Sequence, residues 1–277
     1  MPKAPAPRTS TTRAQTGPIP PLRRSSKASS RSARRTASTA SPIAVTGPNF
    51  LVLVALTSSC DPCITRLLSL PPDLTITQFH EVLQVAFGWQ NGHSYQFTLW
   101  DASVKRGAGR FERALCDHFS CDVFSLSSSP KPCPDSQRTL LDVFEGEAYG
   151  HGKTKLGYLY DMGDGWQHLI TCLGRANSYS AKALGSPEDT KMVCLAGEGH
   201  PCAEDCGGPV GWEILKASFT GRSHVGDFEV GEEQAEERRD WYTSYCANGD
   251  PAGLDPYKWG IKDVNRALRR LSKKWFS

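Results

Sequence analysis

The hydrophobic pattern predicts that the folded part of the chain begins with two strands. Residues 49–56 (NFLVLVAL) contain the longest apolar run of the chain. A continuous run of β-branched and long apolar residues is typical of a strand buried on both faces of a sheet. A second strand is expected over residues 63–71 (CITRLLSLP), after a turn at Asp61 and Pro62. We expect these two strands to pair.

Between residues 75 and 88 the apolar residues recur at helical spacing, which predicts an amphipathic helix. Thr75 is the expected N-cap, because Gln78 follows it three residues later, as in a capping box. Gly88 is expected to end the helix, because glycine readily adopts the left-handed conformation found at helix C-termini. This helix should cover one layer of strands.

The rest of the chain alternates between strands, loops and helices. Residues 155–163 and 166–175 are expected to form a β-hairpin, because an Asp-Gly turn lies between them. Residues 101–137 contain three prolines and a run of serines, and we expect an irregular insertion there. The other expected elements are a strand at 93–100 and helices at 139–147, 210–219, 233–247 and 261–276.

Together these elements predict an α+β fold, in which residues 47–277 form a single compact domain with helices packed on a mixed or antiparallel sheet. Residues 1–46 are rich in Ser, Thr, Ala, Pro and Arg. Such a segment buries too little apolar surface to offset its chain entropy. We therefore expect it to be a disordered tail.

Charge is divided unevenly along the chain. The net charge is +3, but residues 1–60 contain nine Lys or Arg and no acidic residue, so the remainder carries 3 − 9 = −6. The basic run at 23–35 (RRSSKASSRSARR) is compatible with a nuclear localisation signal, an organellar transit peptide or a solvated tail. No apolar stretch approaches the ~20 residues of a membrane-spanning helix. We expect an intracellular protein of the nucleus or cytoplasm without a membrane partner, and mitochondrial import is the alternative.

The hairpin gathers aromatic and polar residues that allow two interpretations. Tyr158 and Tyr160 share one face of the first strand, and Trp166 and His168 share one face of the second. Cross-strand aromatic pairs and turn-forming aspartates give a structural explanation. The alternative is a polar pocket beside the sheet, formed by Asp161, Asp164, His168 and His93. His168 is the residue that the structural interpretation explains least, because a hairpin does not require an imidazole there.

The ten cysteines are expected to be mostly reduced thiols, since intracellular compartments disfavour disulfides. A structural zinc site is the alternative, because four possible ligands lie within thirteen residues: Cys194, His200, Cys202 and Cys206. Their spacing is not a standard zinc-finger pattern. Apart from this possible zinc, no cofactor is expected.

Five motifs follow one another along the chain: LTITQFHEVLQVAFGW, HSYQF, YLYDMGDGWQH, CLAGEGHPCAEDCGGPVGW and DPYKWGIKDVNRALRRL. In this order they resemble the plasmid pRiA4b ORF-3-like family, which is also labelled a TnpR-type passenger of an insertion element. The resemblance covers about residues 48–275 and implies a compact α+β domain with a mixed sheet packed by helices. It implies no particular reaction.

The chain departs from the family pattern in three places. The basic tail is additional, and the insertion at 101–137 is longer and richer in cysteine than the resemblance implies. Cys60 and Cys63, which have the two-residue spacing of a zinc knuckle, stand where the family more commonly has a Pro-Pro-Ile-Trp-Arg-like segment. Ile64 and Arg66 persist from that segment, so the edge of the second strand is expected to differ here.

Three functional hypotheses follow. The sequence contains no G-x-S-x-G, H-E-x-x-H, P-loop or G-x-G-x-x-G motif. The first hypothesis is therefore a non-enzymatic interaction module that binds a protein or peptide through the hairpin and the Cys-rich loop. The family label implies the second, a DNA-associated protein of mobile-element or recombination type, which would contact nucleic acid through the basic tail and the helix at 261–276. The third is a metal-dependent hydrolase that uses His93, Asp161, Asp164 and His168.

Overall fold

The computed structural model describes residues 48–101, 118–121, 137–146, 154–177 and 190–276. These residues belong to one compact unit, residues 44–277. The predicted tail and most of the predicted insertion lie outside the described residues, so the expectations made for them stay predictions.

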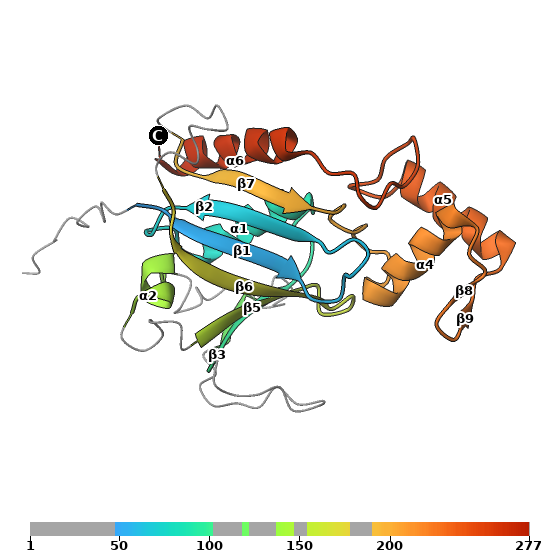
Figure 1. Ribbon diagram of the computed structural model, residues 1–277, viewed down its shortest axis with the longest axis horizontal. Coiled ribbons are helices and arrows are strands. Elements are labelled where there is room, and N and C mark those ends of the chain that lie inside the picture. The colour runs from blue at the N-terminus through green and yellow to red at the C-terminus, as the bar shows by residue number, and fades with distance from the viewer. Residues whose placement is uncertain (1–47, 102–117, 122–136, 147–153, 178–189, 277) are drawn as a thin grey trace, which may run out of the picture. The chain divides into compact units, whose positions relative to one another are not determined.

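A seven-stranded sheet forms the centre of this unit (Figure 1). Its strands are β1 (Phe50–Leu56), β2 (Thr65–Leu70), β3 (Tyr95–Asp101), β4 (His118–Cys121), β5 (Thr154–Tyr160), β6 (Trp166–Arg175) and β7 (Val193–Glu198). They lie in the order β4-β3-β5-β6-β1-β2-β7, and each of these pairings is antiparallel. The predicted α+β class is confirmed. The sequence predicts a mixed or an antiparallel sheet, and the described strands form an antiparallel sheet.

Helices and a small second hairpin complete the unit. They are α1 (Ile76–Phe87), α2 (Leu140–Phe144), α4 (Gly208–Thr220), α5 (Glu232–Ser244) and α6 (Ile261–Phe276), with β8 (His224–Val225) paired to β9 (Phe228–Glu229). Each predicted helix is present, although α2 is shorter than predicted. The insertion at 101–137 is not irregular throughout, since β4 pairs with the edge of β3. None of the described helices combines the length and apolar composition needed to cross a membrane.

Helix α1 covers one face of the sheet, and its ends are the ones that the sequence predicts. Thr75 and Gln78 form a capping box, and Gly88 ends the helix in the left-handed conformation with φ of 67°. Phe79 and Phe87 are fully buried against the sheet. The core of the unit therefore lies between α1 and the strand residues that point toward it.

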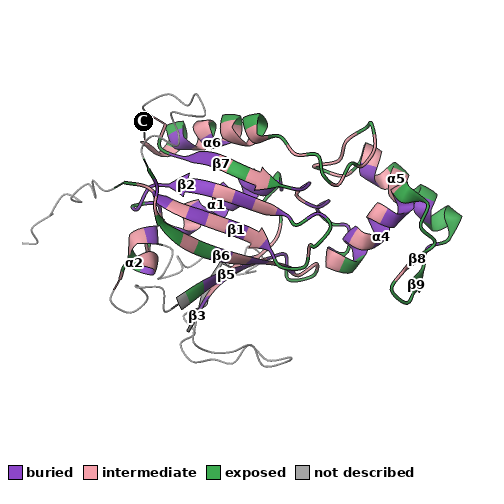
Figure 2. Cartoon of the chain, viewed as in Figure 1, coloured by how far each residue is buried: buried purple, intermediate pink, exposed green. Residues whose placement is uncertain are grey.

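The opposite face of the sheet lacks such a cover in the described residues. Strand β1 alternates between buried and partly exposed residues, so it is not buried on both faces as its continuous apolar run suggests (Figure 2). The partly exposed positions of β1 and β2 and the alternate positions 167, 169 and 171 of β6, of which Thr171 is exposed, face away from α1. We call these positions the open face: Leu51, Leu53, Ala55, Thr65, Leu67, Gln167, Leu169 and Thr171.

A buried arginine joins α1 to two strands of the sheet. Arg66 of β2 is 1% exposed and donates to the carbonyl oxygens of Ala86 (3.0 Å), Thr65 (2.7 Å), Glu198 (2.7 Å) and Gly199 (3.0 Å). Within the described part of the chain it makes no ion pair. Its partners include a carbonyl in the last turn of α1, where the helix dipole places partial negative charge. Burial lowers the pKa of Arg66 to about 10, so the guanidinium is charged at neutral pH.

We expect Arg66→Met to destabilise the fold strongly. Four carbonyl groups, two of them in buried hydrogen bonds and two in partly buried ones, would lose a donor, and such losses typically cost about 3 kcal/mol or more in total. Arg66→Lys should recover only part of this loss, because an ammonium cannot reach three segments at once. Urea unfolding followed by circular dichroism measures both changes. Arg270→Met, on the exposed side of α6, is the matched control; equal stabilities of the Arg66 and Arg270 variants would refute this role.

Candidate functional site

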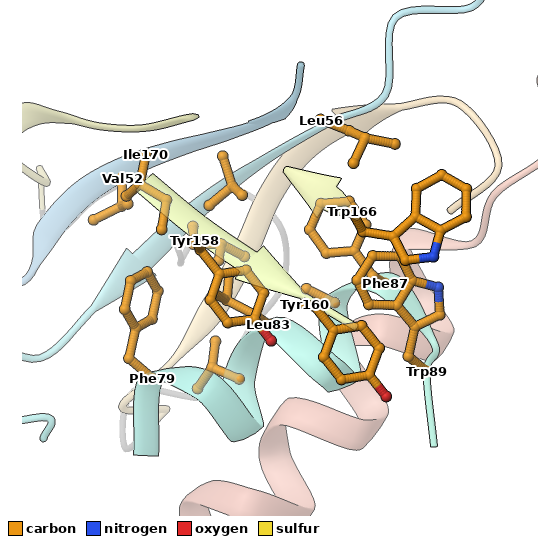
Figure 3. Packing of buried hydrophobic residues seen from close by; sticks show 14 of the residues in the cluster. Val52, Leu56, Phe79, Leu83, Phe87, Trp89, Tyr158, Tyr160, Trp166 and Ile170 are labelled. Atoms are coloured by element: carbon orange, nitrogen blue, oxygen red, sulfur yellow. The ribbon is translucent and has the colours of Figure 1, made fainter. Parts of the chain in front are cut away.

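The aromatic side chains of the hairpin lie in the core. Tyr158, Tyr160 and Trp166 are each at most 1% exposed and lie on the side of the sheet that α1 covers (Figure 3). Trp89, which follows α1, stacks on Tyr160 with ring centroids 4.9 Å apart. Tyr160 and Trp166 are also direct cross-strand partners. These rings stabilise the hairpin and leave a partner no access in this conformation.

Tyr158 belongs to a closed ring of hydrogen bonds. The Gln84 amide donates to the Tyr158 hydroxyl (2.9 Å), which donates to His80 Nδ1 (2.8 Å). His80 Nε2 then donates to Asn91 Oδ1 (2.5 Å), and the Asn91 N–H donates to Gln84 Oε1 (2.9 Å). These directions follow because an amide oxygen only accepts. Burial lowers the pKa of His80 to about 4, which keeps its imidazole neutral.

His168 lies apart from the polar residues with which the sequence grouped it. It is 2% exposed and faces the rings of Phe87 and Trp89 at 4.6 and 5.4 Å. Its Nδ1 donates toward the carbonyl oxygens of Trp166 (3.1 Å) and Tyr158 (3.3 Å). Burial lowers its pKa to about 3. The prediction that His168 shares a polar pocket with His93, Asp161 and Asp164 is therefore wrong for His168, because its side chain points into the core.

A buried carboxylate connects the hairpin to the Cys-rich loop. The Tyr160 hydroxyl donates to Glu204 Oε1 (2.6 Å), and the Gln90 N–H donates to Glu204 Oε2 (2.7 Å). Glu204 is 4% exposed. Burial, together with this carboxylate, raises the pKa of Tyr160. Three segments that are distant in sequence are thus fixed relative to one another.

The turn of the hairpin brings three potential metal ligands together. His93 lies between two carboxylates: its Nδ1 is 3.6 Å from Asp161 Oδ2, and its Nε2 is 2.8 Å from Asp205 Oδ1. One ligand atom from each of these residues lies within 4.8 Å of the other two. In the described ranges this is the one group of three or more His, Cys, Asp or Glu that meets this criterion. The sequence anticipated the approach of His93 to Asp161 but not Asp205.

Asp164 adds a further carboxylate beside this group. Its Oδ2 accepts a hydrogen bond from the Gly207 N–H at 3.3 Å. Burial raises its pKa, and the negative charges of Asp161 and Asp205 act in the same direction. Within the described residues the carboxylates of Asp161, Asp164 and Asp205 form no ion pair with Lys or Arg, and His93 is the basic side chain that contacts Asp161 and Asp205.

The predicted zinc ligands form no such group in the described part of the chain. They are Cys194, His200, Cys202 and Cys206. The Cys194 thiol points to the Ala196 carbonyl at 3.3 Å, and His200 Nε2 is hydrogen-bonded to the Tyr242 hydroxyl at 3.0 Å. Burial raises the pKa of Cys194 to about 11 and also raises those of Cys202 and Cys206. These thiols are therefore protonated at neutral pH, and zinc at this place stays a prediction.

A pocket of about 520 Å³ opens on the other side of the Cys-rich loop, between the end of α1 and the start of α6. His200, Trp259 and Arg66 contribute to its wall. Most of its charged groups have partners, since Lys258 bonds to Asp250 at 2.5 Å, Asp263 pairs with Arg266, and Arg66 donates to four carbonyls. Asp255 also lines the pocket and, among the described residues, forms no ion pair, so it is the charged group there that lacks a cationic partner.

The buried histidines should make stability depend on pH. The pKa values of His80, His168 and His200 are lowered to about 4, 3 and 4, from 6.5 in the unfolded chain. Between pH 6.5 and 4 the unfolded chain binds protons that the folded chain does not. The free energy of unfolding must therefore fall as the pH falls, by up to about 1.4 kcal/mol per pH unit for each histidine.

Urea unfolding at several pH values between 7 and 4 measures this slope. We expect His168→Phe to flatten it by one proton, and His224→Asn, at an exposed position, to leave it unchanged. An identical slope for the wild type and His168→Phe would contradict the burial of a neutral imidazole.

Comparison with known proteins agrees with the fold and with the motifs. The family described as plasmid pRiA4b ORF-3-like protein matches residues 49–257. The uncharacterized protein y4hQ of Sinorhizobium fredii (strain NBRC 101917 / NGR234) is 26% identical over 215 residues, which cover 78% of this chain and 88% of that protein. A crystal structure of a protein of unknown function from Methanosarcina mazei Go1 has a TM-score of 0.52 at 21% identity and covers 78% of this chain and 96% of that chain, a likeness of fold alone. The chain belongs to the plasmid pRiA4b ORF-3-like protein family.

Proposed function

We propose that the domain is a non-enzymatic interaction module that uses the open face of its sheet to bind a protein, and that a second copy of the chain is this partner. The observation that carries the proposal is a row of partly exposed leucines on adjacent strands. Leu53 of β1 pairs with Leu67 of β2, and Ala55 pairs with Leu169 of β6. None of these residues belongs to the core cluster. A contiguous apolar patch on a protein surface often marks an interaction site.

Charge and area support a face-to-face association of two copies. The open face contains no charged residue, so two identical faces would not repel each other. With the flanking strands β5 and β7, this side of the sheet comprises five strands about 4.8 Å apart and about 20 Å long, or roughly 500 Å² in projection. The open face is its centre, and Lys155 of β5 and Glu198 of β7, which have opposite charges, lie on the rim. A specific interface takes about 800 Å² of accessible surface from each partner, and accessible surface exceeds projected area. The open face with its rim therefore has a suitable size, and antiparallel sheets commonly pack face to face.

The buried polar residues support a binding role rather than catalysis. His80, His168 and His200 are neutral near pH 7, as their lowered pKa values indicate. A general acid or base works best with a pKa near the working pH and within reach of a substrate. These imidazoles meet neither condition, so a structural role in the core explains them better than acid or base catalysis.

The DNA-associated alternative depends on the basic residues of α6. Arg266 already pairs with Asp263 at 3.0 Å and Lys274 with Glu81 at 3.2 Å. Cations in the last turn also stabilise the helix itself through its dipole. The basic tail, the other predicted contact, lies outside the described residues. The geometry therefore favours the interaction module over this alternative.

Sedimentation equilibrium of the full chain tests the proposal. We expect a dimer for the wild type and a monomer for the double variant Leu53→Lys, Leu169→Lys, because like charges would then face each other across the interface. Tyr245→Lys is the matched control, since it places the same charge on an apolar residue that is 81% exposed elsewhere. Urea unfolding verifies that each variant is folded. A wild type that stays monomeric, or a double variant that stays dimeric, would refute the proposal.

A further inference from the structure

We propose that His93, Asp161 and Asp205 form a binding site for a divalent cation of the kind that accepts mixed nitrogen and oxygen ligands, such as Mn²⁺. One ring nitrogen and one oxygen from each carboxylate would contact the ion, and water would fill the remaining positions. The site lies at the turn of the hairpin and shares no residue with the open face. Its test is therefore independent of the proposed dimer.

The separations between the donor atoms suit one shared ion. Two ligands bound to an ion at about 2.1 Å lie about 3.0–3.5 Å apart in tetrahedral or octahedral geometry. His93 Nδ1 and Asp161 Oδ2, 3.6 Å apart, are close to this separation and too far apart for a good hydrogen bond. Asp205 contacts the other ring nitrogen, Nε2, at 2.8 Å, so its side chain, which is 61% exposed, would leave that contact and turn toward the ion at Nδ1.

The two carboxylate oxygens of Asp161 make different contacts. Oδ1 accepts hydrogen bonds from the N–H groups of Gly163 (2.8 Å) and Asp164 (3.3 Å), which fixes the turn. Oδ2 faces His93. The carboxylate is thus oriented by the main chain before any ion binds, and such orientation of ligands by further hydrogen bonds is characteristic of metal sites.

Charge also favours a cation at this place. Asp161 and Asp205 lie beside Asp164 and the buried Glu204, and the described residues supply no Lys or Arg ion pair to them. A dication would offset most of this negative charge. The mixed ligand set selects the class of ion, since an imidazole suits transition metals and carboxylates suit Mn²⁺ and harder ions.

A simpler explanation is that a protonated His93 bridges the two carboxylates without any metal. The two explanations differ in what they predict for added metal. A metal site gains affinity from all three side chains, whereas an imidazolium bridge is indifferent to metal or is displaced by it only weakly. A metal titration therefore decides between them.

The experiment is a titration of the metal-free full chain with Mn²⁺ alone, followed by electron paramagnetic resonance of the free ion. Mn²⁺ is the chosen probe because it avoids thiols, so the cysteines of this chain do not compete for it. We expect one Mn²⁺ per chain. The variants His93→Gln, Asp161→Asn and Asp205→Asn should each weaken binding at least about tenfold.

The variants are chosen to preserve the fold. Asparagine at position 161 keeps an oxygen for the turn, and asparagine at position 205 tolerates the positive φ of 65° found there. Asp240→Asn, at an exposed carboxylate on α5, is the matched control and should bind Mn²⁺ like the wild type. Circular dichroism verifies that all variants are folded. Mn²⁺ that stays free in the presence of the wild type, or that binds the wild type and the three site variants alike, would overturn the proposal.

Discussion

A guanidinium without a carboxylate partner holds the described unit together. Arg66 lies over the rings of Trp259 and Phe87, at 4.3 and 5.3 Å from their centroids, and its hydrogen bonds within the described residues go to main-chain carbonyls. A buried charge is costly unless polar groups surround it. The last turn of α1 and the end of β7 provide these groups, so the charge is tolerated only when helix and sheet take this relative position. The rest of the architecture depends on that condition.

The other polar residues in the core act in the same way. The ring formed by His80, Gln84, Tyr158 and Asn91 ties α1 to β5, and Glu204 ties the Cys-rich loop to Tyr160. Each group finds its partners only in one arrangement of the chain, and a half-satisfied network would be less stable than an apolar core. These residues therefore specify the fold. Candidate binding sites are left at the periphery, on the open face and at the turn of the hairpin.

Much of this fold was readable from the sequence, for reasons that differ between elements. Helix α1 was predictable to its caps, because Thr75, Gln78 and Gly88 are local signals. The hairpin was predictable because alternation and an Asp-Gly turn are also local. The exposure of one face of β1 was not predictable, since a continuous apolar run does not reveal which face of the strand a helix covers. Nor was the pairing of β4, which depends on an edge of β3 that only the folded sheet presents.

The candidate site was predictable only in part. The position of His168 could have been inferred, because it alternates with Trp166 and Ile170 and must share their buried face. The sequence grouped His93 and Asp161 in one alternative polar pocket, and these two residues do lie close together. Asp205 was missed because it lies 44 residues after Asp161, and loop positions carry no periodicity that would place it. Arg66 stood out through the family resemblance, but its carbonyl partners require the tertiary structure.

Hydrogen exchange of the Arg66 Nε–H, followed by nuclear magnetic resonance, tests the central claim most directly. If Arg66 fixes α1 on the sheet, this proton should exchange only through global unfolding, as slowly as the most protected amides of β1 and β2. Exchange as fast as that of the exposed Arg270 would show that the guanidinium is accessible in the native state and would contradict this account.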